Sequence, residues 1–183
     1  MVMDIGTGIL LALWTIDHFG VPFGLGVIVF GIFAALFPDL DTLTAFLPEG
    51  NFLHKIVGDH RGLFHRPFFY FFLCPVVFLL GGMPYGVLFT LGVAYHLVHD
   101  TFFLGWGIKW LWPFSQKSLS LFHDMNGKIT REILYWDPKD DAVIRAKYQT
   151  PDWIRIFYFR PGFISLTEYP VLIVALILLY HRF

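Results

Sequence analysis

The sequence predicts an all-α, polytopic membrane protein, built as a bundle of about four or five apolar helices with a polar, partly interfacial C-terminal segment. Of the 183 residues, 56% are hydrophobic, 20% are aromatic and only 15% are charged. The mean hydropathy is +0.62, which is far more apolar than in ordinary globular domains. Long stretches without a charged residue also alternate with short polar clusters, as in membrane-embedded helices. We therefore expect membrane lipid as the first partner of this chain.

Two apolar segments are expected at the N-terminal end. A weak helix is predicted from Ile5 to Ile16, followed by a polar break at Asp17-His18 and an uncharged run from Phe19 to Phe37. At about 1.5 Å per residue, the second run nearly crosses a hydrocarbon core of about 30 Å, whereas the first is short and is expected to lie partly in the interface. The start of the chain lacks the positive region of a cleavable signal peptide, so the first segment is expected to be retained.

A helical hairpin is predicted for the next apolar stretch. Residues Pro67 to Tyr95 contain no charge, and Gly81-Gly82-Met83-Pro84 interrupts them near the middle. Each arm is short for a full crossing, so a buried helical pair is the alternative. A last apolar helix is predicted from Tyr169 to Tyr180.

The whole chain, 1–183, is expected to form one membrane-embedded domain, with a motif-bearing core at 1–115, a polar interfacial segment at 116–162 and a C-terminal apolar helix at 163–183. The net charge of −1 and the lack of a basic run with stacking aromatics argue against a nucleic-acid partner. Cys74 is the only cysteine. Any metal must therefore be held by histidine and carboxylate.

Six such groups fall at the ends of predicted helices: Asp39, Asp41, His60, His65, His96 and Asp100. Two crossings between Pro67 and Asp100 would return the chain to the same side, so all six are expected at one membrane face. Their donor atoms suit a divalent metal, with zinc the first choice and manganese and iron compatible. Taken singly, the aspartates are equally explained as a helix stop, and His96 with Asp100 as a buried hydrogen-bonded pair. Lysines and arginines flank this face and are absent from the hairpin turn, which predicts the cytoplasmic side.

A family resemblance rests on four motifs in order: Pro-Asp-Leu-Asp (38 to 41), His-Arg-Gly-x-x-His (60 to 65), His-x-x-x-Asp (96 to 100) and Trp-Pro-Phe-Ser (112 to 115). Together they resemble the YdjM-type (DUF457) membrane-bound metal-dependent hydrolases, which are thought to be distantly similar to zinc-dependent phospholipase C. The resemblance covers about residues 1–115. Two positions depart from the family pattern: Gly8 stands where a histidine is common, and Arg66 where a small residue is common.

The resemblance implies hydrolysis of a phosphoester or lipid-like substrate by a metal-activated water. It implies a metal shell of His60, His65, His96, Asp100 and one or both of Asp39 and Asp41. A carboxylate left over, Asp41 or Asp100, would act as general base or orient a histidine. Arg61 would stabilise a developing phosphoryl charge.

Two other functions stay open at this point. One is a non-catalytic scaffold or regulatory membrane protein with a structural metal site, and the other is an ion or proton transporter. Transport requires polar groups deep in the spans. Apart from Asp17 and His18, the predicted spans contain none, which counts against transport.

Overall fold

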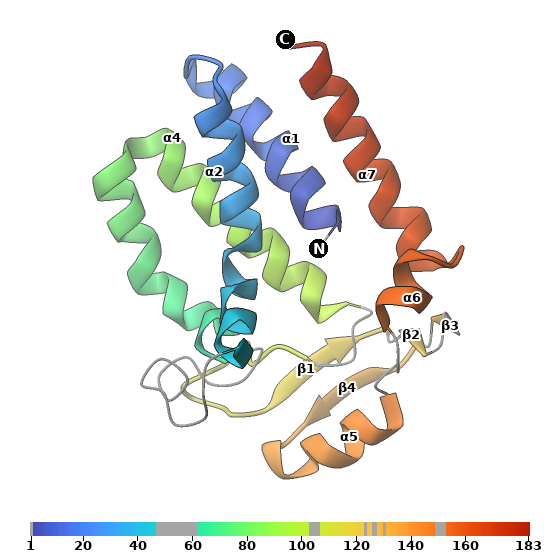
Figure 1. The fold of residues 1–183 in the computed structure, drawn as a ribbon. Coiled ribbons are helices and arrows are strands. Elements are labelled where there is room, and N and C mark those ends of the chain that lie inside the picture. Colours follow the sequence, from blue (N-terminus) through green and yellow to red (C-terminus); the bar gives the residue numbers. More distant parts are fainter. Residues whose placement is uncertain are drawn as a thin grey trace.

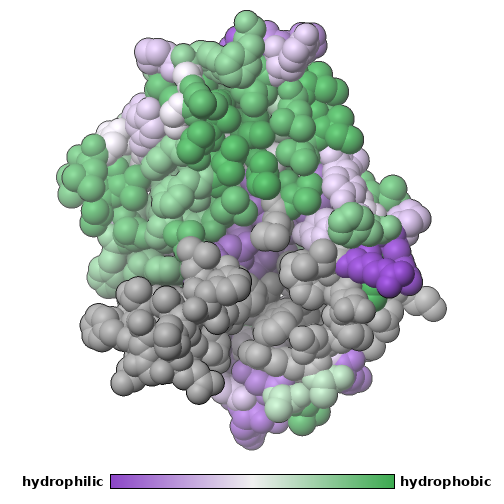
Figure 2. Space-filling view, viewed as in Figure 1, coloured by the Kyte–Doolittle hydropathy of each residue, from purple (hydrophilic) through white to green (hydrophobic). Residues whose placement is uncertain are grey.

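Helices dominate the structure, a computed structural model that describes residues 2–46, 62–102, 107–122, 124–125, 128–129, 131–148 and 153–183. The bundle consists of α1 (Val2–Phe19), α2 (Leu25–Leu36), α4 (Pro67–Thr101) and α7 (Phe163–Tyr180) (Figure 1). Within the described residues, α1, α4 and α7 are long and apolar enough to cross a membrane. Apolar side chains cover most of the helical part in the view of Figure 2. The prediction of a helical membrane bundle is confirmed.

The boundary between the first two helices differs from the prediction. Asp17 and His18 do not break the chain but lie inside α1, which ends at Phe19, before Gly20 with a φ of 65°. Both are exposed, and the His18 ring stacks on Trp14 one turn earlier. Exposed polar side chains at a helix end leave the backbone hydrogen bonds intact, whereas a glycine at positive φ ends the helix. The expectation that the second helix is the longer of the two is therefore wrong, because α1 has 18 residues and α2 only 12.

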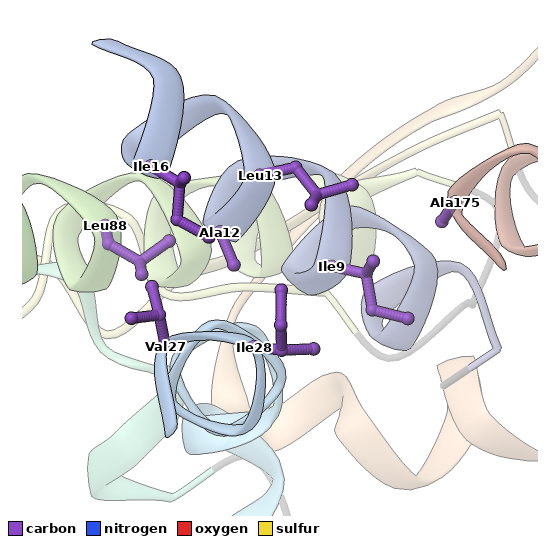
Figure 3. Close-up of a cluster of buried hydrophobic side chains, with 8 residues drawn as sticks. All are labelled: Ile9, Ala12, Leu13, Ile16, Val27, Ile28, Leu88 and Ala175. Carbon is purple, nitrogen blue, oxygen red and sulfur yellow. The ribbon is translucent and has the colours of Figure 1, made fainter. Parts of the chain in front are cut away.

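α1 and α2 pack closely along an apolar seam. Figure 3 shows this cluster of side chains from α1, α2, α4 and α7: Ile9, Ala12, Leu13, Ile16, Val27, Ile28, Leu88 and Ala175. Close to it, the two backbones meet at Gly8 and Gly31, where a Cβ on Gly8 would lie 2.6 Å from the Gly31 carbonyl oxygen. Small residues permit this close approach. The contact fixes α1 against α2 and so determines where the first turn of α1 lies.

The predicted break in the third apolar stretch is confirmed. Gly82 has φ 72° and ψ −176°, which interrupts α4 and turns the chain back (Figure 1). The two arms touch near the turn, since a Cβ on Gly86 would lie 2.3 Å from the Phe78 ring. α4 continues past Tyr95 to Thr101, so His96 and Asp100 lie at the end of its second arm, as expected. Its two ends consequently lie toward the same end of the bundle (Figure 1).

The polar segment contains strands that the sequence analysis did not predict. β1 (Ser118–Leu121) pairs antiparallel with β4 (Ile133–Trp136), and β2 (Asp124–Met125) pairs with β3 (Lys128–Ile129). Polar and apolar residues alternate in β1, but the buried positions are the serines Ser118 and Ser120 rather than the leucines, which is the reverse of the pattern expected for a half-buried strand. The segment also contains η3 (Pro138–Asp140), α5 (Asp141–Tyr148) and α6 (Trp153–Tyr158). α7 begins at Phe163, where the expected C-terminal segment 163–183 begins, and thus before the apolar run that starts at Tyr169.

Candidate metal centre

Three parts of the chain meet at one end of the bundle. The helix α2 runs into the 3-10 segment η1 (Phe37–Phe46), which carries Asp39 and Asp41. A second 3-10 turn, η2 (Leu63–His65), carries His65 just before α4 begins, and the last turns of α4 carry His96 and Asp100. The hairpin of α4 therefore returns His96 and Asp100 to the end of the bundle where His65 lies. The structure brings all five of these predicted site residues together.

The two imidazoles face the same pair of carboxylates. His65 Nε2 lies 3.6 Å from Asp39 Oδ1 and 3.4 Å from Asp100 Oδ2. His96 Nε2 lies 3.6 Å from the same Asp39 oxygen and 3.8 Å from the same Asp100 oxygen. These separations are longer than typical N–H···O hydrogen bonds of about 2.7 to 3.2 Å. Ligand atoms at about 2.0 to 2.1 Å from a tetrahedral zinc lie about 3.3 to 3.4 Å from one another.

The donor set fits a divalent metal ion. Ligand atoms of Asp39, His65 and His96 all lie within 4.8 Å of one another. His96 Nε2 is buried and accepts or donates no hydrogen bond within the described parts of the chain, although a buried ring nitrogen normally has a partner. Imidazole with carboxylate is a donor set that zinc, manganese and iron accept. The three residues therefore form a possible metal site.

Asp41 lies behind His65. Its Oδ2 atom is 2.8 Å from His65 Nδ1 and also accepts the backbone N–H of Gly62 at 3.1 Å. The Asp41 side chain is 0% exposed. A carboxylate that holds the Nδ1 hydrogen directs the other ring nitrogen toward a metal and strengthens it as a donor. Asp41 was predicted as a ligand, as a general base or as a group that orients a histidine, and its contact with the ring nitrogen that faces away from Asp39 and Asp100 suits the last of these.

The charge balance of the centre is visible in two pKa shifts. Burial opposes protonation of His65, but the carboxylates of Asp100, Asp39 and Asp41 around its ring outweigh it and raise the pKa of His65 to about 9. Burial also disfavours the charged form of Asp39, yet the nearby imidazoles of His65 and His96 hold the pKa of this carboxyl well below its usual range. In the metal-free protein a positive His65 therefore neutralises part of the carboxylate charge.

His96 is oriented by the backbone and by a residue that the sequence analysis missed. Its Nδ1 atom lies 2.8 Å from the carbonyl oxygen of Ala35. A carbonyl can only accept, so Nδ1 carries a hydrogen and Nε2 is the atom available to a metal. Asp4 Oδ1 lies 3.2 Å from the same Nδ1 atom. The predicted first helix began one residue after Asp4, although a carboxylate in the first turn of an apolar helix is itself a signal of function.

A second buried carboxylate was also missed. Glu168 of α7 accepts the backbone N–H of Met3 at 3.1 Å and the Tyr158 hydroxyl at 3.4 Å. His99 lies between the two carboxylates, 3.8 Å from Asp4 and 3.9 Å from Glu168. The expectation that only Asp17 and His18 are polar within the spans is therefore wrong. A hydropathy average conceals single carboxylates such as Asp4 and Glu168, which are buried inside α1 and α7.

Two predicted site residues, His60 and Arg61, lie outside the described residues, and their roles stay predictions. The neighbouring Arg66 is described. Its guanidinium lies 4.6 Å from the centre of the Trp112 ring, a cation–π arrangement. Burial lowers the pKa of the Arg66 guanidinium, which nonetheless stays charged at neutral pH. The effect of this cation on the site, which the departure from the family pattern suggested, stays a prediction.

The comparisons with known proteins identify the family. The chain matches the family described as YdjM inner membrane protein over residues 2–180. The match extends well past the expected 1–115 and includes the polar segment and all of α7. No curated protein and no solved structure gives a significant match, and the similarity to zinc-dependent phospholipase C stays a prediction. The apolar helices and the match along nearly the whole chain show that this protein belongs to the YdjM family of inner membrane proteins.

Proposed function

We propose that this chain is a membrane-bound, metal-dependent hydrolase that acts on a phosphoester or lipid-like substrate. The observation that carries the proposal is the matched orientation of two buried histidines. Each has Nδ1 against an oxygen acceptor and directs Nε2 at the same oxygens of Asp39 and Asp100. Two separate segments thus present a metal-binding nitrogen to one point, an arrangement that a purely structural histidine pair does not require.

The proposed roles follow from these contacts. Asp39, His65 and His96 would hold the ion, and Asp41 would hold His65 in its binding orientation. Asp100 faces both Nε2 atoms and would serve as a further ligand or as the general base. The ion would supply a Lewis acid that polarises a phosphoryl or carbonyl oxygen and lowers the pKa of water. His60 and Arg61 keep their proposed parts as ligand and as stabiliser of negative charge.

A lipid-like substrate is supported by the surroundings of Arg66. The cation–π partner Trp112 also contacts Phe68 of α4, and Phe68 contacts Phe114, which is 86% exposed. Aromatic side chains with an arginine are typical of the membrane interface. Arg66 would bind a phosphate there while the rings contact acyl chains. We place the site on the cytoplasmic face of a multi-pass protein, on the charge distribution alone.

Ion or proton transport is the second candidate, and one observation favours it. Asp4 and Glu168 are buried carboxylates inside candidate membrane helices, and such groups are typical of ion pathways. Asp4 lies in the first turn of α1 and Glu168 in the second turn of α7, close to the candidate metal centre rather than along the length of the bundle. This position favours a single polar site over a path across the membrane.

The test is metal content and hydrolysis measured on detergent-purified protein. We expect about one zinc or manganese per chain and cleavage of at least one member of a panel of phosphoesters and phospholipids. His65→Ala and His96→Ala should each remove most of the metal and the activity. The double variant should be little worse than either single one, because both ligands act on one ion.

His181→Ala is the matched control, since His181 follows α7 at the opposite end and is exposed. It should keep both metal and activity. Metal binding without turnover on the whole panel would favour the scaffold function. A wild-type protein that binds no metal and melts identically with and without a chelator would refute the metal site and the hydrolase together.

A further inference from the structure

Asp4 is a buried carboxylate that the catalytic roles above do not use. It is 1% exposed, yet it lies in the first turn of an apolar helix. Its Oδ1 atom is 3.2 Å from His96 Nδ1 and 3.8 Å from His99 Nδ1. A buried carboxylate loses its hydration, and this loss is tolerated where positive or hydrogen-bonding groups surround it. Both of the ring nitrogens near Asp4 come from the last turns of α4.

The packing of α1 leaves Asp4 little freedom. Glu168 accepts the Met3 backbone N–H, one of the groups at a helix start that has no partner inside the helix. Two turns of α1 then run against neighbouring backbones, since a Cβ on Gly6 would lie 2.9 Å from Leu172 Cα and one on Gly8 2.6 Å from Gly31 O. α7 and α2 therefore hold the start of α1 from two sides and keep Asp4 at His96.

The same arrangement occurs twice around the centre. Asp41 of η1 contacts His65 Nδ1, and Asp4 of α1 contacts His96 Nδ1 together with the Ala35 carbonyl. In each case the carboxylate is on the opposite side of the ring from Nε2, which faces Asp39 and Asp100. A negative charge at Nδ1–H raises the electron density at Nε2 and so strengthens it as a metal donor.

We propose that Asp4 is the positioning residue of His96, and that its charge contributes to metal affinity although it does not touch the metal. The inference rests on the proposed metal site. The Ala35 carbonyl by itself determines which ring nitrogen carries the hydrogen. Asp4 adds the negative charge, so its effect is separable from the tautomer of His96.

The experiment measures zinc and manganese dissociation constants of the full chain in detergent, by competition with a chromophoric chelator. Asp4→Asn retains the size and an acceptor oxygen but removes the charge. We expect about 10- to 100-fold weaker binding, as is usual when a group behind a metal-binding histidine is lost. Asp4→Glu retains the charge and should retain most of the affinity. Should Asp4→Asn fail to fold, Asp4→Ser removes the charge with a smaller side chain.

Glu168→Gln is the matched control, because Glu168 is equally buried and contacts His99, while the glutamine oxygen can still accept the Met3 N–H that holds the start of α1. Its metal affinity should stay within about twofold of wild type. A structural role of Asp4 would lower the melting temperature in chelator, whereas the proposed role reduces the rise in melting temperature that metal produces. Equal affinities of wild type and Asp4→Asn would overturn the inference, as would equal losses in Asp4→Asn and Glu168→Gln. Wild-type protein that binds neither metal would overturn the proposed function itself.

Discussion

Proton competition at His65 gives the sharpest test of the metal centre. In the metal-free protein the carboxylates around His65 raise its pKa to about 9. At pH 7 a metal that takes Nε2 must therefore displace a proton. The gap of about two pH units costs about 2.7 kcal/mol, since each unit corresponds to about 1.36 kcal/mol. His65 alone should make the apparent metal affinity rise about tenfold per pH unit from pH 7 to 9 and level off above that.

The assay is titration calorimetry with zinc or manganese at pH 7, 8 and 9, repeated in buffers of different ionisation enthalpy to count released protons. About one proton should leave His65 at pH 7, while Asp39 adds none because its pKa lies well below its usual range. Asp41→Asn removes one of the carboxylates that raise the pKa of His65, so its affinity should level off at a lower pH. An affinity that is equal at pH 7 and 9, or binding without proton release at pH 7, would refute this reasoning.

The same shift predicts the stability of the protein in chelator. The folded-state pKa of His65, about 9, lies above its ordinary value of 6.5, so protonated His65 stabilises the folded state fully below about pH 6.5. This contribution is lost as the pH rises through about 9 and amounts to at most about 3.4 kcal/mol. The metal-free protein should accordingly melt at a lower temperature at pH 9.5 than at pH 6.

Two further predictions concern the bundle. Gly8→Ala places a Cβ 2.6 Å from the Gly31 carbonyl oxygen, so we expect a loss of about 1 to 3 kcal/mol of unfolding free energy and weaker metal binding through displacement of Asp4. Gly26→Ala in α2 has open space around it and should melt within a few degrees of wild type; equal melting of the two variants would show that the α1–α2 contact is looser than described. For topology, cysteines at Met83 and Asp140 in a Cys74→Ser background should label from opposite sides of the membrane, and labelling from one side would mean that the arms of α4 do not cross.

Local features of the sequence determined much of the architecture. The long uncharged stretches predict apolar helices because backbone groups in lipid must be satisfied within the helix. Gly81-Gly82-Met83-Pro84 predicts the turn in α4 because Gly82 can adopt positive φ, as it does with φ 72°. That reversal of the chain predicts that His65, His96 and Asp100 lie at the same end of the bundle, and the distances between them confirm it. These inferences need only neighbours in sequence and the direction of each helix.

The remaining features depended on contacts between distant segments. Asp17-His18 was predicted as a helix break, yet α1 continues through both residues because their polar side chains are exposed and need no buried partner. Which side chains are exposed is decided by the packing of the bundle. The strand β1 buries Ser118 and Ser120, so its burial pattern cannot be inferred from hydrophobicity. Sequence separation likewise conceals that Glu168 holds the start of α1.

The candidate metal centre shows most clearly which features follow from local sequence and which depend on tertiary contacts. The sequence supplied Asp39, His65, His96 and Asp100, because ligand-type residues at helix ends are visible one segment at a time. Only the tertiary structure determined which ring nitrogen of each histidine faces the others, and so placed Asp41 behind His65 and Asp4 behind His96. The physical reason is that the role of a carboxylate beside an imidazole depends on distances of a few ångströms between separate segments, which the order of residues along the chain does not contain.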